Sequence, residues 1–123
     1  MRVADTRFLY AVFNASDGHH AKARDAVAAA QPLGIPFPIL AETLDLMAYR
    51  AGRDVAAEAW SSLSTLPTLR LLDAPHEPTM EIWSRYSRLS LSDAACIATA
   101  LEQDAQLLSY DKAQLAAWRA ERR

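Results

Sequence analysis

The chain has 123 residues, a length suited to one domain with a hydrophobic core of its own. Hydrophobic residues make up 51% of it and only three residues are Gly, which favours a globular fold over disorder. Its net charge of -2 argues against an architectural nucleic-acid binder, although an enzyme could still meet nucleic acid through a local patch and a bound metal.

The sequence gives no sign of a membrane or secreted protein. No apolar run approaches the roughly 20 residues that a membrane span needs, and the first residues show no cleavage site of a signal peptide. Cys96 is the single cysteine, so no internal disulfide can form, and its Ala-rich surroundings favour a small buried side chain over a reactive thiol. We therefore expect a cytoplasmic protein.

The first part of the chain alternates short apolar runs with helical patterns. A strand is predicted at residues 2–4, and apolar side chains at helical spacing then predict a helix over residues 6–14. A helix over residues 18–30 follows, with Asp17 as its candidate cap. Prolines surround the next apolar run, which predicts a short strand at residues 35–40.

The rest of the chain continues this alternation. Glu42 opens a predicted helix that Gly52 ends. The remaining predicted elements are a helix over 53–66, a strand at 68–72, helices over 75–88 and 93–103, a strand at 106–109, and a helix over 112–122. Ser90 or Ser92 is the candidate cap of the helix over 93–103. Strands that alternate with helices predict a parallel sheet covered on both faces.

Four acids are expected at one edge of that sheet. Asp5 ends the first strand, Glu42 opens the helix after the second, and Asp111 follows the fourth. Asp93 begins the helix that leads into the fourth strand, so it should start at the same edge, where ligands gather in parallel sheets. Each acid alone could be a helix cap or a turn residue. Their joint placement predicts a site for Mg²⁺ or Mn²⁺, and at least one raised carboxyl pKa when no metal is bound.

Three segments of the sequence resemble, in order and spacing, the motifs of PIN-domain proteins. They are "VADTRFLYAVFNASDGHH", "ILAETLDLM" and "LSLSDAACIATALEQDAQLLSYDK", and they are most similar to the VapC-type toxins of prokaryotic toxin–antitoxin pairs. The resemblance covers nearly the whole chain and implies a single PIN-like domain over residues 1–123. It implies a three-layer α/β/α sandwich with a mostly parallel central sheet, Mg²⁺- or Mn²⁺-dependent endoribonuclease activity on RNA, a cognate antitoxin and a homodimer.

The same resemblance implies roles for individual residues. It assigns the catalytic and metal-binding roles to Asp5, Glu42, Asp93 and Asp111. Arg7 stands where the family often has a small hydroxyl residue, which leaves Thr6 and Ser109 as candidate orienting residues. Arg7, Arg85 and Arg88 are candidates for contact with substrate phosphates, and solvated surface charge is the alternative reading of each.

The surface for a second copy is less well defined by the sequence. Trp60, Leu63 and Leu66 form an apolar set on one predicted helix. These residues either belong to the core or form an interface for a second copy of the chain or an antitoxin.

Other functions remain open at this stage. A phospho-acceptor signalling module would use Asp73 and Lys112, but it leaves Glu42 and Asp93 without a role. A phosphatase of the haloacid type would need a second Asp where Arg7 stands. A PIN fold kept only to bind a partner is a further alternative, and an intact set of four acids argues against it.

Overall fold

A parallel sheet of four strands forms the centre of the protein, whose computed structural model describes residues 1–122. The strands are β1 (Arg2–Ala4), β2 (Leu33–Pro36), β3 (Leu69–Leu72) and β4 (Gln106–Leu108). Their spatial order is β3-β2-β1-β4, and each neighbouring pair is parallel, as the alternating sequence pattern predicted. The first strand therefore lies between the second and the last.

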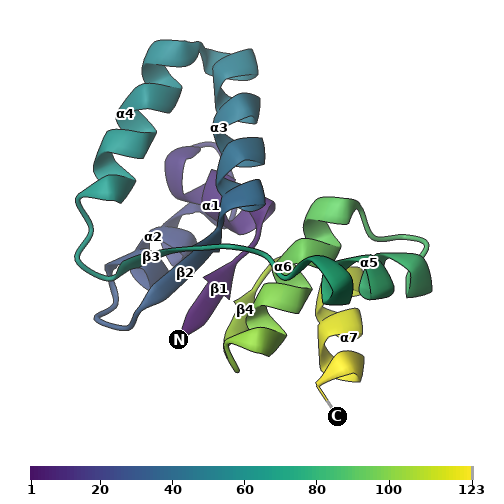
Figure 1. Cartoon of the computed structure of the whole chain (residues 1–123). Helices are drawn as coiled ribbons and strands as arrows, with labels where there is room; N and C mark the ends of the chain where they lie inside the picture. Colours follow the sequence, from purple (N-terminus) through teal and green to yellow (C-terminus); the bar gives the residue numbers. More distant parts are fainter. Residues whose placement is uncertain (123) are drawn as a thin grey trace.

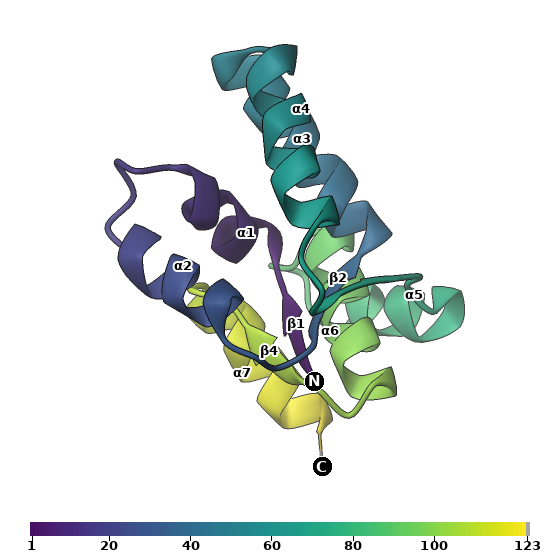
Figure 2. The same ribbon diagram turned by 90° about the vertical axis from the view of Figure 1, so that its left-hand side faces the viewer.

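Helices cover both faces of this sheet. They are α1 (Thr6–Phe13), α2 (His20–Ala28), α3 (Phe37–Ala51), α4 (Arg53–Ser64), α5 (His76–Arg85), α6 (Leu91–Glu102) and α7 (Lys112–Glu121). Figure 2 shows α2 on one side of the strands and α5 with α6 on the other. The α3–α4 hairpin rises beyond the end of the sheet at which β1 continues into α1 (Figure 1). This arrangement agrees with the predicted three-layer α/β/α sandwich.

Helix α6 is the most deeply buried helix, because its side chains are small. Residues 94–100 are all buried, and five of these seven are Ala or Cys. Cys96 donates from its Sγ to the backbone oxygen of Ala4 at 3.4 Å, and burial raises the pKa of this thiol well above its usual range. The prediction of a buried, unreactive cysteine is therefore supported by the structure.

The boundary between β2 and α3 differs from the prediction. The predicted strand at residues 35–40 is instead Leu33–Pro36, and α3 begins at Phe37 rather than at Glu42. Pro38 explains the difference, because a proline in the first helical turn needs no N–H partner and its fixed φ suits the helix. Glu42 consequently lies in the second turn of α3, still close to the sheet edge.

Of the two roles left open for the apolar residues at the end of α4, core or interface, the structure supports the core for Leu63 and Leu66. Leu63 is only 1% exposed and belongs to the core, and Leu66 packs against that core. Trp60 alone of the three is exposed, so the set cannot form a continuous apolar surface. In the part of the chain that the structure describes, no helix is both long and apolar enough to cross a membrane.

Candidate active site

Asp5 and Asp111 are brought together by the pairing of β1 with β4. Ala4 and Leu108 are partners in this pair, and the backbone N–H of Asp5 donates to the oxygen of Leu108 at 3.1 Å. Asp5 then caps α1 by accepting from the N–H of Phe8 at 2.7 Å. Asp111 caps α7 by accepting from the N–H groups of the second and third helical residues. Both carboxylates are therefore held at the same edge by the starts of helices.

Asp93 and Glu42 reach this edge from two further helices. Asp93 forms a capping box with Ser90 at the start of α6, in which each side chain accepts from the other residue's backbone N–H. Glu42 lies on the exposed side of α3, where its Oε2 accepts from the hydroxyl of Ser92 at 2.5 Å. This hydrogen bond joins the second turn of α3 to the first turn of α6.

The electrostatic environment of Asp5 shows that the acids lie near one another. Its side chain is only 2% exposed, and burial raises its pKa to about 6. The charges of Asp93 and Asp111 raise this pKa further, while hydrogen bonds from Ser109 and the N–H of Phe8 lower it. A raised pKa was predicted from repulsion between the acids; the pKa of Asp5 is raised, but burial is the larger cause and repulsion by Asp93 and Asp111 the smaller one.

Among residues 1–122, no cationic side chain forms an ion pair with these acids. The ion pairs found between residues 1 and 122 join Arg85 to Glu81 and to Glu121, and none includes Asp5 or Asp93. A buried carboxylate close to two others is costly to ionise without a countercharge. The site therefore has the electrostatic character of a cation-binding site.

The same part of the chain holds no ready-made metal site. Among residues 1–122, no group of three or more His, Cys, Asp or Glu side chains is arranged to hold a metal ion. Glu42, Asp93 and Asp111 each use one carboxylate oxygen for a local hydrogen bond. A carboxylate has two oxygens, so these caps leave oxygen ligands of the kind that Mg²⁺ and Mn²⁺ prefer. Metal binding by the four acids stays a prediction.

The candidate orienting residues occupy the same region. Ser109 accepts from the N–H of Asp111 at 3.0 Å and donates to Oε1 of Gln114 at 2.9 Å. The hydroxyl of Thr6, the residue after Asp5, is buried and makes no hydrogen bond to any described residue. Ser109 thus contacts the acid site directly, whereas the structure gives Thr6 no partner among residues 1–122.

The three candidate phosphate contacts differ in their surroundings. Arg7 is exposed on α1, two positions after Asp5. Arg85 is held by ion pairs with two glutamates of α5 and α7, and the closer of these contacts measures 2.5 Å. Arg88 is exposed in the segment between α5 and α6. Arg7 is therefore better placed than Arg85 to offer a free charge to a phosphate.

Gln114 is a site residue that sequence reasoning missed. It is fully buried on α7, and its side chain accepts from Ser109 and donates to the backbone oxygen of Asp93 at 3.4 Å. Its own N–H donates to Asp111 at 3.2 Å. A buried glutamine on a helix whose other polar residues are exposed has no distinctive sequence signal, because its burial depends on the packing of α7 against α6.

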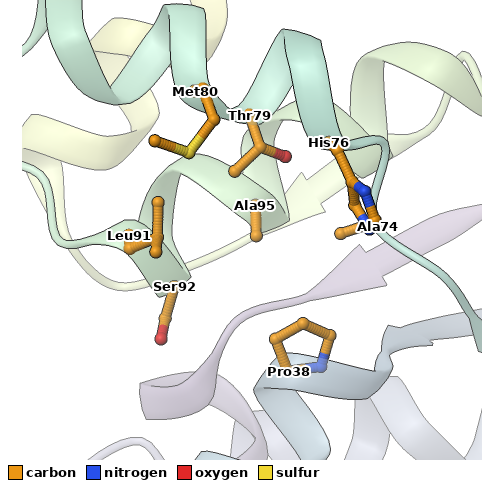
Figure 3. Close-up of a pocket in the computed structure, with 8 residues that line it drawn as sticks. All are labelled: Pro38, Ala74, His76, Thr79, Met80, Leu91, Ser92 and Ala95. Carbon is orange, nitrogen blue, oxygen red and sulfur yellow. The ribbon is translucent and has the colours of Figure 1, made fainter.

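Ser92, which donates to Glu42, also lines an apolar groove. Figure 3 shows the side chains of its lining, which come from α3, α5, α6 and the segment before α5: Pro38, Ala74, His76, Thr79, Met80, Leu91, Ser92 and Ala95. The groove has a volume of about 270 Å³. His76 is its only ionisable side chain, so the groove resembles a contact surface more than a second catalytic site.

Comparison with known proteins gives a consistent result. The chain matches the family model described as the PIN domain over residues 2–117. VapC20 from Mycobacterium tuberculosis, a sarcin-ricin loop cleaving toxin, superposes with a TM-score of 0.79 at 22% identity over 95% of each chain. VapBC2 from Rickettsia felis, solved with a DNA fragment from its promoter, superposes with a TM-score of 0.65 at 12% identity over 89% of this chain and 87% of that one. No curated protein matches at the level of sequence.

Proposed function

Because the chain belongs to the PIN domain family, we propose that it is a metal-dependent endoribonuclease, the toxin of a toxin–antitoxin pair. The observation that carries this proposal is the buried Asp5, whose carboxylate is gathered with Asp93 and Asp111 at the sheet edge without a cationic partner among the described residues. The likeness in fold to a toxin that cleaves the sarcin-ricin loop supports RNA as the substrate class.

The acids have distinct positions for this chemistry. Asp5, Glu42, Asp93 and Asp111 would hold Mg²⁺ or Mn²⁺, which supplies a more acidic water and polarises a phosphoryl oxygen. Asp5 is fixed by Phe8 and Ser109, so it orients rather than moves. Glu42 is exposed, and only its Oε2 is used by Ser92. We assign Glu42 or Asp93 the acceptance of a proton from the attacking water.

Partners follow from the same proposal. We propose a cognate antitoxin and a homodimer in addition to the RNA substrate. The exposed apolar side chains of the described chain include Met80, Trp83 and Leu91, which are 46–49% exposed. Met80 and Leu91 line the groove in Figure 3, and Trp83 follows Met80 by three positions on α5. We place the contact between two copies here instead of on α4.

The structure disfavours the phospho-acceptor alternative. Asp73 follows β3, whereas Lys112 begins the helix after β4, and these two strands lie at opposite edges of the sheet. An acceptor and its lysine partner would therefore be separated by the width of β1 and β2. A PIN fold that only binds a partner remains the alternative that activity measurements address.

The deciding experiment compares two substitutions in one assay. Asp5→Asn should reduce Mn²⁺-dependent cleavage of total RNA by about 10²-fold or more, because an amide carries no charge for the site. Asp73→Asn is the matched control, with the same chemical change at an exposed strand end, and should cleave normally. Circular dichroism should show both variants folded, and calorimetry should show weaker Mn²⁺ binding by Asp5→Asn alone. Loss of cleavage in Asp73→Asn with normal cleavage in Asp5→Asn would overturn the assignment.

A further inference from the structure

A second groove is lined by chain neighbours of the acids, among them Thr6 and Tyr110, although none of the four acids lines it. It has a volume of about 470 Å³, within the usual range of ligand sites, and it lies between α1, α3 and the segment that joins β4 to α7. Leu46 and Arg50 of its lining follow Glu42 by one and two helical turns on the same side of α3. Tyr110, which also lines it, immediately precedes Asp111. The groove and three of the acids are therefore carried by the same elements, so the groove lies close to the acid site.

We infer that this groove binds a single-stranded segment of RNA next to the bond that is cleaved, with phosphates held by Arg7 and Arg50 and a base stacked on His19. The inference rests on the proposed function, whose substrate it describes more closely. It assigns Arg50 and His19, which the sequence did not single out for substrate binding, to the recognition of RNA.

The charges of the groove are suited to phosphate. Arg7 and Arg50 are exposed, and neither takes part in an ion pair with another described residue. The guanidinium carbon of Arg50 lies 5.4 Å from the centroid of the Tyr10 ring, which favours a position over the groove wall. Asp17 is the one acidic side chain among the described residues of the lining, and its Oδ1 accepts from the N–H of His19. Two guanidinium groups that have no ion pair with another described residue thus line this groove.

The aromatic side chains of the groove are suited to a base. Tyr110 stacks with Phe8 at a centroid distance of 5.4 Å and with His19 at 3.9 Å, and the His19 and Tyr110 rings are nearly parallel, at 8°. Phe8 is buried and His19 is exposed, so this stack of three rings runs from the core to the surface. A base stacked on an aromatic ring contributes about 1–3 kcal/mol. Duplex RNA keeps its base faces covered, so a single strand is the form that fits.

The binding test does not require cleavage. A fluorescent single-stranded RNA of about twelve nucleotides is titrated with the protein in EDTA, and affinity is read from fluorescence anisotropy at several salt concentrations. Arg50→Gln should weaken binding and reduce the slope of log affinity against log salt by about 0.7, the value for one phosphate contact on a single strand. His19→Ala should weaken binding by about 5- to 100-fold, whereas His19→Phe should retain most of the affinity because it keeps a flat ring.

A matched control and a duplex probe complete the experiment. Arg53→Gln removes an exposed arginine of α4 outside this groove and should bind the RNA as the unaltered protein does. Unchanged affinity in both Arg50→Gln and His19→Ala, or equally tight binding of the same sequence as a duplex, would overturn the inference. If the groove variants lose RNA affinity but no cleavage is found with Mn²⁺, the proposed function fails and the groove assignment stands. If RNA is cleaved while these variants bind normally, the groove assignment alone fails.

Discussion

Asp5 combines two tasks at one residue, and these tasks have opposite effects on stability. Its Oδ1 caps α1, which stabilises the fold, while its burial beside two other carboxylates makes its negative charge costly. The cap fixes the position of the Asp5 carboxylate, and burial raises its pKa. Ser109 links Asp5 to Gln114, because its hydroxyl donates to Oε1 of Gln114 and its proximity lowers the pKa of Asp5.

The free energy of unfolding should show the cost of charging Asp5. Its folded-state pKa of about 6 lies above the usual 3.8, so the folded protein binds this proton more tightly than the unfolded chain does. The resulting stability is present below about pH 4 and is lost as pH rises to about 6. The free energy of unfolding of Asp5→Asn should therefore exceed that of the unaltered protein by up to about 3 kcal/mol at pH 7 in EDTA. At pH 3.5 the two proteins should differ little. Urea unfolding at the two pH values checks this, and equal differences at both would contradict it.

The proton of Ser109 offers a test of Gln114 as a positioning residue. Gln114→Met removes the acceptor of the Ser109 hydroxyl, which leaves that hydroxyl free to donate to Asp5 and should lower the pKa of Asp5 below about 6. An NMR titration of the Asp5 carboxyl carbon in EDTA should show this lower pKa. Ser109→Ala should raise the pKa of Asp5 in the same titration, because Asp5 loses the favourable contact with the hydroxyl. Shifts in the same direction for both variants would assign Gln114 a purely structural role.

At the scale of elements, the start of α6 contributes to both the fold and the site. Ser90 forms the helix cap, and two positions later Ser92 contacts α3 through Glu42. Ser90 therefore stabilises the start of its own helix, whereas Ser92 links α6 to α3. This separation allows stability and activity to be measured independently.

Single substitutions of these two serines should separate the effects. Ser90→Ala should lower the free energy of unfolding by about 1 kcal/mol, as the loss of an N-cap usually does, with cleavage little changed. The backbone N–H of residue 90 still holds the Asp93 carboxylate in that variant. Ser92→Ala should leave stability nearly unaltered, because its hydrogen bond is exposed, and should reduce RNA cleavage several-fold by releasing Glu42. Thermal unfolding and RNA cleavage assays on both variants test this prediction. Equal losses of stability and of cleavage in the two variants would contradict it.

The same elements show what sequence reasoning could and could not predict. Asp5 and Asp111 were placed correctly because each follows an apolar run that ends at a recognisable boundary. The start of α3 was placed late, because Pro36 and Pro38 suggested a strand bounded by prolines, whereas Pro36 is the N-cap and Pro38 lies in the first turn of the helix. The role of Leu63 was left open between core and interface, because helical spacing defines an apolar face without telling which side of the α3–α4 hairpin meets the core. Such errors and open alternatives arise where tertiary packing decides between two readings of one local pattern.

At the scale of the whole molecule, the apolar groove in Figure 3 and the acid site share the first turn of α6, because Ser92 lines the groove and donates to Glu42. A second copy bound at the groove would contact the same turn that holds Glu42. Dimer formation and the geometry of the site are therefore expected to be coupled through Leu91 and Ser92.

The oligomeric state should respond to a charge placed in this groove. Met80→Glu puts a carboxylate on a side chain that is 48% exposed and lines the groove, so the proposed homodimer should dissociate. Trp60→Glu is the control, since Trp60 lies on α4 and is 38% exposed, outside the proposed contact. Sedimentation velocity at micromolar concentration should show a dimer for the unaltered protein and Trp60→Glu, and a monomer for Met80→Glu. A monomer in all three would exclude the dimer.

The position of β1 between β2 and β4 also has a consequence for folding during synthesis on the ribosome. Synthesis delivers β1 first, yet its second neighbour contains Gln106, more than a hundred positions after its partner Arg2. A parallel pairing between strands so far apart in the sequence is slow to form, because the entropy of closing a long loop is lost before the contacts that offset it are made. Asp5 and Asp111 meet only through this pairing. A nascent chain would therefore lack the complete set of acids until its last strand had docked, which would delay any cleavage of RNA until synthesis had passed residue 111.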